Sequence, residues 1–93
     1  MNVTRAALAG SLESSDVLVS LGPRDGDSLE FQIESIVIKQ FGERIRRIAE
    51  EVCTAAGLTG AIVRIQDRGA LECTMRARLE TAIARATAPQ EPA

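Results

Sequence analysis

The chain has 93 residues, a formal net charge of −2 at pH 7, and 45% hydrophobic and 26% charged residues. These values are ordinary for one small globular domain. They exclude a general nucleic-acid binder, because such a protein needs clustered Lys and Arg to neutralise phosphates. No stretch approaches the roughly 20 apolar residues of a membrane span, and the first residues lack the pattern of a signal peptide. We therefore expect a cytoplasmic protein that binds neither nucleic acid nor membranes.

The first segment, Val3 to Ala9, is compatible with a weak strand or a short helix, and its periodicity does not decide between them. Asp16 to Leu21 is rich in β-branched residues and predicts a strand. The turn residues of Gly22 to Asp27 follow. Leu29 to Glu34 alternates apolar and polar side chains, so it predicts a second strand of this type, with its apolar residues facing inward.

From about Ser35 the hydrophobic period changes to steps of three and four residues, which predicts a helix. Gly57 is expected to end this helix as a left-handed cap, with Leu58 folding back on the last turn. The predicted apolar stripe of this helix comprises Ile38, Phe41, Ile45, Ile48 and Val52.

Ala61 to Gln66 alternates again and predicts another strand. The turn Asp67 to Gly69 leads into a second predicted helix over Ala70 to Ala86. Residues 87–93 have no periodicity and are expected to be a disordered tail after a folded domain of residues 1–86. The apolar stripe predicted for the second helix comprises Leu71, Met75, Leu79, Ile83 and Ala86.

The predicted order of elements is β-β-β-α-β-α. Strands that alternate in polarity form sheets with one solvated face, so both helices are expected to cover the other face. The fold class is therefore α+β, a two-layer sandwich with a mainly antiparallel sheet of about four strands and two helices on one face.

The chain offers few groups for catalysis. It contains no histidine, which excludes Ser-His and Cys-His nucleophile pairs and most zinc sites. Cys53 and Cys73 lie in helical patterns and are expected to be reduced, buried thiols. No carboxylate stands in a pattern that would bury it among apolar residues. We expect neither a catalytic residue nor a metal site.

Five arginines gather near the last strand and helix, and a solvated face paired with neighbouring glutamates is favoured over an anion site. These residues are Arg64, Arg68, Arg76, Arg78 and Arg85.

Three serines stand close together in the stretch AGSLESSDVLV, from Ala9 to Val19. From the residues alone, Ser11, Ser14 and Ser15 are interpreted as turn formers, because a hydroxyl without a base is a poor nucleophile. A hydroxyl on an exposed turn can nevertheless be an anchor that another enzyme modifies.

Three blocks of the sequence together resemble the citrate lyase acyl carrier protein family, the gamma subunit of that complex. The blocks are AGSLESSDV from Ala9 to Val17, KQFG from Lys39 to Gly42, and DRGALECTMRARLETAIARA from Asp67 to Ala86. The resemblance covers nearly the whole chain apart from the tail.

The resemblance implies a covalent carrier that is not itself an enzyme. In that family the serine of the LES block carries phosphoribosyl-dephospho-CoA through a phosphodiester, and this serine corresponds to Ser14. The implied partners are the alpha (transferase) and beta (lyase) subunits of citrate lyase and a prosthetic-group transferase. One departure is Ser15, since a small residue such as glycine often follows the modified serine. Ser15 is a competing attachment site, although in an extended segment its side chain would point the other way.

Alternatives stay open. A carrier of a related complex, such as citramalate lyase or malonate decarboxylase, would use similar chemistry, and a non-covalent α+β interaction module would use none. A further hypothesis is that Glu13 and Asp16 repel the phosphates of the prosthetic group and hold its arm off the surface.

Overall fold

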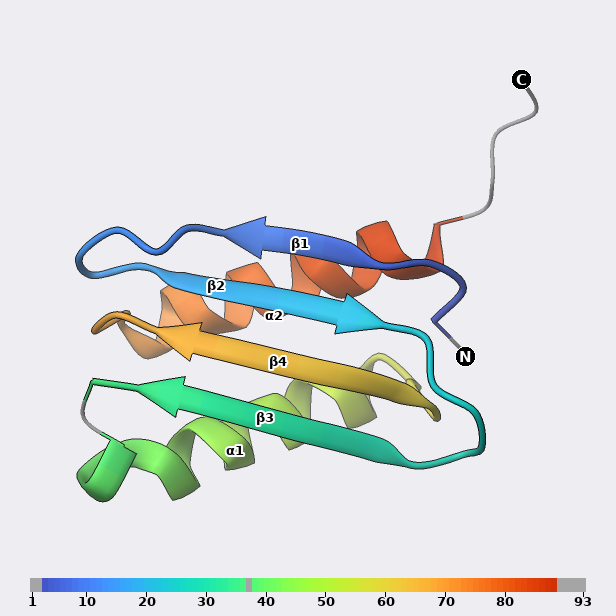
Figure 1. The fold of residues 1–93 in the computed structure, drawn as a ribbon, viewed down its shortest axis with the longest axis horizontal. Helices are drawn as coiled ribbons and strands as arrows, with labels where there is room; N and C mark the ends of the chain where they lie inside the picture. Colours follow the sequence, from blue (N-terminus) through green and yellow to red (C-terminus); the bar gives the residue numbers. More distant parts are fainter. Residues whose placement is uncertain (1–2, 37, 89–93) are drawn as a thin grey trace.

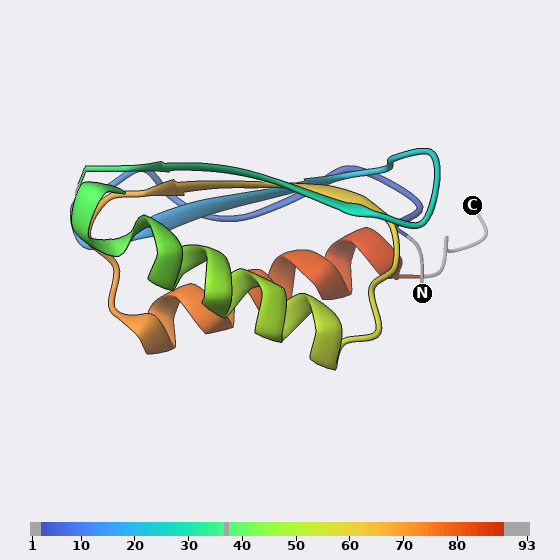
Figure 2. The ribbon, with the colours of Figure 1, turned by 90° about the horizontal axis from the view of Figure 1, so that it is seen from below.

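The computed structural model describes residues 3–36 and 38–88, without the side chains of residues 38–41. It contains a single layer of four strands with two helices packed on one face, so the expected two-layer α+β sandwich is confirmed (Figures 1 and 2). The elements are β1 (Ala7–Gly10), β2 (Val17–Gly22), β3 (Leu29–Ser35), α1 (Ile38–Ala55), β4 (Ala61–Asp67) and α2 (Glu72–Thr87).

The strand order in the sheet is β1-β2-β4-β3 (Figure 1). β1 pairs with β2, and β2 with β4, in antiparallel orientation. β3 pairs with β4 in parallel orientation, since α1 is the crossover that returns the chain to the same end of the sheet. The expectation of a mainly antiparallel sheet is therefore confirmed, and one parallel pair is added to it.

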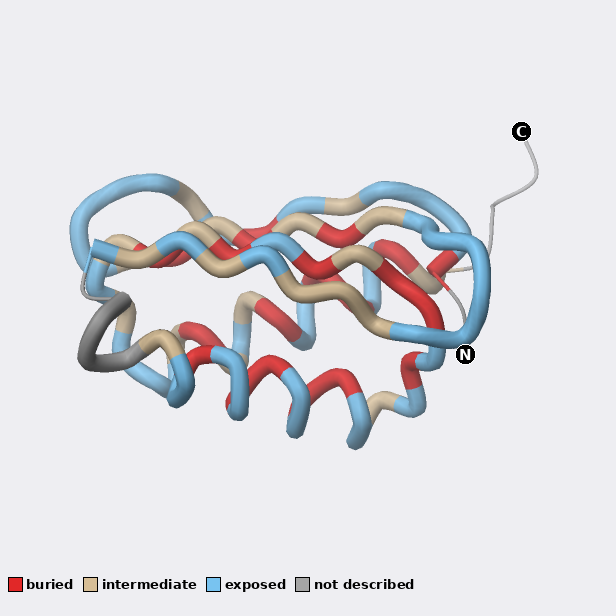
Figure 3. The backbone as a smooth tube through the Cα atoms, turned by 60° about the horizontal axis from the view of Figure 1, so that its bottom comes forward, coloured by how far each residue is buried: buried red, intermediate tan, exposed pale blue. Residues whose placement is uncertain are grey.

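The core lies between the sheet and the helices (Figure 3). In β2, every second side chain points toward the helices, as the period of two predicts. These side chains are almost completely buried and belong to Val17, Val19 and Leu21. Phe31 and Ile33 of β3 also pack against the core, but they are only half-buried because β3 is an edge strand. The open face of the sheet is polar over β3, where Gln32 and Glu34 are exposed.

Helix α1 confirms the predicted stripe where its side chains are described. Ile45, Ile48 and Val52 are buried against the core, whereas the predictions for Ile38 and Phe41 fall on side chains outside the described ones. The predicted cap is also confirmed. Gly57 has a φ of 75°, its N–H donates to Thr54 at 3.0 Å, and the N–H of Leu58 donates to Cys53 at 3.0 Å.

Helix α2 begins at Glu72 rather than at the predicted Ala70. The carboxylate of Asp67 accepts the N–H groups of Gly69 and Ala70, which keeps this segment in a turn. Leu71 consequently precedes the helix in extended conformation and is 71% exposed, so its assignment to the buried stripe was wrong. The buried residues of α2 are Met75, Leu79, Ala82, Ile83 and Ala86.

Cys53 is buried and Cys73 is exposed, and both are free thiols. The prediction of a buried Cys73 was wrong because this residue lies two positions before Met75, on the opposite side of α2. Thr87 still belongs to α2, and the predicted tail beyond residue 88 lies outside the described residues. Within the described ranges, neither helix has the length and apolarity needed to cross a bilayer.

Candidate functional site

The three serines lie in the loop of residues 11–16, which joins β1 to β2 at one end of the sheet (Figure 1). The N–H of Asp16 donates to the carbonyl of Glu13 at 3.1 Å, so residues 13–16 form a β-turn with Ser14 and Ser15 at its two central positions. Both serines are exposed. Over the parts of the chain that the structure describes, the Ser14 hydroxyl has no hydrogen-bond partner, so no basic side chain is bonded to it.

The backbone of Ser15 has a φ of 65°, in the left-handed region that glycine adopts without steric strain. The expectation of an extended segment was therefore wrong, since this backbone turns at Ser14 and Ser15. The N–H of Ser15 donates to the backbone carbonyl of Arg68 at 2.8 Å, and the N–H of Arg68 donates to the backbone carbonyl of Asp16 at 2.9 Å. These two bonds fix the loop to the chain that follows β4.

Asp16 is the anchor of the loop. Its carboxylate accepts a hydrogen bond from the Ser11 hydroxyl at 2.7 Å and another from its neighbour, the Val17 N–H, at 2.7 Å. Arg78 of α2 donates to both carboxylate oxygens, at 3.2 and 3.3 Å. These bonds from Ser11, Val17 and Arg78, in that order of effect, lower the pKa of Asp16 to about 2.

The structure separates the roles of Glu13 and Asp16, which the hypothesis from the sequence assigns together to the repulsion of bound phosphates. Asp16 is only 17% exposed and its charge is paired with Arg78, so its role is to hold the loop. Glu13 is exposed and makes no ion pair with any described residue, so it alone retains a free negative charge beside Ser14.

Gly10 determines how closely the loop can approach β2. Its φ is 94°, and a Cβ at this position would lie 1.8 Å from the carbonyl oxygen of Val17 and 3.3 Å from Arg78. Only glycine fits such an approach. The glycine of the AGS motif is therefore required by the backbone geometry at the entry to the loop.

The arginines near the last strand and helix have different partners. Arg76 pairs with Glu51 at 2.6 Å and with Glu72 at 3.2 Å, which confirms the expected pairing with glutamates for this residue. Arg85 instead donates to the carbonyl oxygen of Leu8 at 2.8 Å and ties α2 to β1.

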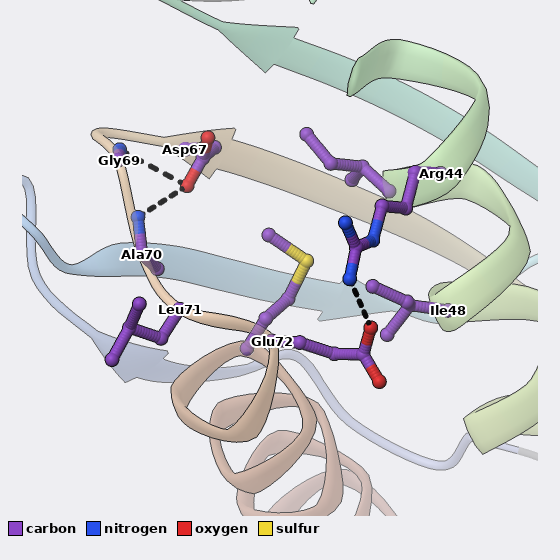
Figure 4. A pocket seen from close by; sticks show the side chains of 9 residues that line it. Arg44, Ile48, Asp67, Gly69, Ala70, Leu71 and Glu72 are labelled. Atoms are coloured by element: carbon purple, nitrogen blue, oxygen red, sulfur yellow. Dashed lines mark hydrogen bonds and ion pairs between the residues drawn. The ribbon is translucent and has the colours of Figure 1, made fainter.

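Sequence reasoning missed Asp67, a carboxylate that is 3% exposed at the end of β4. It accepts a bond from the Ser35 hydroxyl at 2.8 Å. It also accepts bonds from the N–H groups of Gly69 at 3.2 Å and Ala70 at 3.0 Å (Figure 4). The alternation of the last strand placed position 67 on the buried face, and this was the available signal. In the described part of the chain, no three metal-ligating side chains converge.

Comparison with known proteins decides the family. Residues 4–86 match the family model described as ACP, malonate decarboxylase delta subunit (MdcD). The citrate lyase acyl carrier protein of Escherichia fergusonii is 46% identical over 91 residues, which cover 98% of this chain and 94% of that protein. The protein of the same name from Rhodopseudomonas palustris is 49% identical over 86 residues, covering 92% and 88%.

The chain belongs to this acyl carrier protein family. It is accordingly a non-catalytic carrier subunit of an enzyme complex, as the resemblance implied. The carrier fold also matches a chain in the crystal structure of a Pseudomonas malonate decarboxylase hetero-tetramer in complex with malonate. The TM-score is 0.81 at 24% identity, over 92% of this chain and 88% of that one, which shows a shared fold.

Proposed function

We propose that this carrier serves citrate lyase and holds phosphoribosyl-dephospho-CoA on Ser14 through a phosphodiester. The observation that carries the proposal is the identity of 46% and 49% to curated citrate lyase acyl carrier proteins over nearly the full chain. The LES block at Leu12 to Ser14 agrees with it. Citramalate lyase, whose chemistry is closely related, would be a host complex of the same kind.

The geometry of the loop fits such a group. The Ser14 hydroxyl is exposed, has no partner among the described residues and lies on a turn, so its oxygen can attack the phosphorus of an activated donor bound to an enzyme. The P–O bond to the donor's leaving group then breaks, and the hydroxyl proton is lost. The acidic neighbour Glu13 disfavours collapse of a phosphate onto the loop. Asp16 and Arg78 hold the root of the arm at a fixed place on the domain.

When bound, the prosthetic group supplies a thiol that holds acetyl and citryl units as thioesters. The carrier's contribution is to tether that thiol. A tethered acyl unit has a high effective concentration at each active site that the arm reaches, and no free intermediate escapes. We propose that the partners are the alpha (transferase) and beta (lyase) subunits in the cytoplasm, and that a separate prosthetic-group transferase modifies Ser14.

The family model and the shared fold with the malonate decarboxylase chain support a second candidate, a carrier of malonate decarboxylase. The two candidates share the attachment chemistry and differ in the acyl group and in the catalytic subunits. Citrate lyase is preferred because the named curated relatives are far more similar in sequence than the malonate decarboxylase chain.

The test is the intact mass of the protein purified from its native host, with fragmentation to locate the adduct. We expect phosphoribosyl-dephospho-CoA on Ser14 and cleavage of citrate by the purified complex. Ser14→Ala should abolish both the adduct and turnover, whereas the neighbouring control Ser15→Ala should retain both. An adduct on Ser15 would reassign the site. Unmodified carrier inside an active complex would refute the covalent role, and turnover of malonate instead of citrate would establish the second candidate.

A further inference from the structure

A cavity of about 290 Å³ opens at the same end of the molecule as the serine loop. It lies between the second and third turns of α1 and the start of α2, next to the end of β4 (Figure 4). Ile45, Ile48 and Met75 give it apolar walls, and Arg44 and Glu72 stand at its edge. Among the residues whose side chains are described, the lining comprises Arg44, Ile45, Ile48, Asp67, Gly69, Ala70, Leu71, Glu72 and Met75.

The cavity is maintained by the turn that starts α2. Asp67 holds the N–H groups of Gly69 and Ala70, so Leu71 cannot fold inward as part of the helix. Leu71 lines the cavity yet is 71% exposed, which leaves a large apolar side chain at its mouth without cover. Such a side chain is available to an apolar ligand that enters from this end of the molecule.

The cavity wall and the serine loop are parts of one hydrogen-bonded unit. Val17, directly after the loop, is the register partner of Asp67 in the sheet. Ser15 and Asp16 bond to Arg68, which stands between the two cavity residues Asp67 and Gly69. Because neighbouring strands lie about 5 Å apart, a flexible arm rooted on Ser14 begins only about one or two strand spacings from the cavity.

We propose that this cavity receives the acyl-thioester end of the arm that Ser14 anchors, when the carrier is between catalytic subunits. The inference rests on the proposed function. A cavity of this volume is at the lower end of ligand pockets, so it accommodates a short acyl group with its thioester and excludes the nucleotide portion of the arm. The apolar walls suit the uncharged thioester and shield it from water.

Arg44 adds a preference for a carboxylate-bearing acyl group. Its guanidinium lies 3.0 Å from Glu72, and the two side chains are 61% and 41% exposed. Ion pairs of this exposure contribute little to stability, so Arg44 can exchange Glu72 for a carboxylate on the bound acyl unit. A citryl unit offers such a carboxylate and an acetyl unit does not.

Met75 provides a direct test, because the chain has only two methionines and Met75 is the one that lines the cavity among the described residues. Carrier labelled with ¹³C at the methionine methyl groups is compared by NMR in the unmodified, thiol, acetyl and citryl forms. We expect the Met75 methyl signal to shift on acylation and to show a nuclear Overhauser contact with protons of the arm. Fragmentation of the same sample verifies the adduct on Ser14.

Arg44→Ala should reduce that contact by about twofold or more in the citryl form and leave it unchanged in the acetyl form. The matched control is Arg47→Ala, on the same helix but outside this cavity. A Met75 signal that stays unchanged and without arm contacts, in carrier verified to be acylated on Ser14, would overturn the cavity assignment and leave the proposed function standing. Native carrier without an adduct would refute both.

Discussion

Arg78 on α2 donates to both carboxylate oxygens of Asp16, at 3.2 and 3.3 Å, across 62 residues of sequence. This contact ties the helix to the loop that carries Ser14. The serine therefore stands on a loop that is fixed at its base and free at its turn, a combination that suits the root of a mobile arm.

The first prediction concerns the titration of Asp16. Its pKa is about 2 in the folded chain, below the ordinary value of 3.8 for an aspartate. A lowered pKa contributes stability that is present above the unfolded value and is lost as the pH falls through the folded value. We expect the Asp16 carboxyl carbon to titrate near pH 2 by NMR. Arg78→Met should move the midpoint upward, and an unchanged midpoint in this variant would show that Ser11 and Val17 suffice.

Gly10→Ala should unfold or strongly weaken the domain. The added Cβ would lie 1.8 Å from the Val17 carbonyl oxygen, and φ is 94°. Strain of this kind costs about 1–3 kcal/mol before the clash is counted. Urea denaturation measures the loss. Gly22→Ala is the matched control, because a Cβ there meets nothing within 4 Å and φ is not in the left-handed region. Equal effects of the two substitutions would contradict the close approach between Gly10 and Val17.

Ser15→Gly should stabilise the carrier slightly. The left-handed backbone at Ser15 costs a non-glycine residue roughly 1–2 kcal/mol, and the greater entropy of glycine in the unfolded chain offsets part of this. We expect a gain of up to about 1 kcal/mol in the free energy of unfolding. A clear loss of stability would mean that the Ser15 side chain makes a contact that outweighs its backbone strain.

The two thiols should differ sharply in reactivity. Burial raises the pKa of Cys53 to about 11, whereas Cys73 is exposed. Because the thiolate is the reactive form, iodoacetamide at neutral pH should label Cys73 in the folded, unmodified carrier and leave Cys53 intact until the chain is denatured. Peptide mass spectrometry after a time course measures both sites. Rapid labelling of Cys53 in native buffer is the contrary result.

Local patterns predicted most of the fold. The alternation of the strands and the apolar stripes of the helices depend on residues close together in the chain. They can therefore be predicted from a single sequence for β2, β3, β4, α1 and α2. The placement of β4 between β2 and β3 depends on pairing between distant strands, which periodicity does not encode. The error at Leu71 arose from a side-chain contact, because the carboxylate of Asp67 delays the start of α2.

The site was predicted in part. The serine turn and the expectation of a small residue after Ser14 came from motif and resemblance, and the positive φ of Ser15 now gives that expectation a physical reason. The partners Arg68 and Arg78 could not be predicted, since they approach the loop only in the folded chain. The cavity beside Met75 likewise depends on how two helices diverge, which neither stripe specifies.

β4 is the central partner of both β2 and β3, yet it is synthesised after them. A nascent chain that stops before Ala61 holds β1 and β2, which pair with each other, and β3, which pairs with neither of them, so the four-stranded sheet is completed only after β4 has emerged from the ribosome. The serine loop also lacks its hydrogen bonds to Arg68 and Arg78 until these residues have been synthesised, which is later still. An enzyme that recognises the finished loop therefore acts on completed molecules and does not modify growing chains.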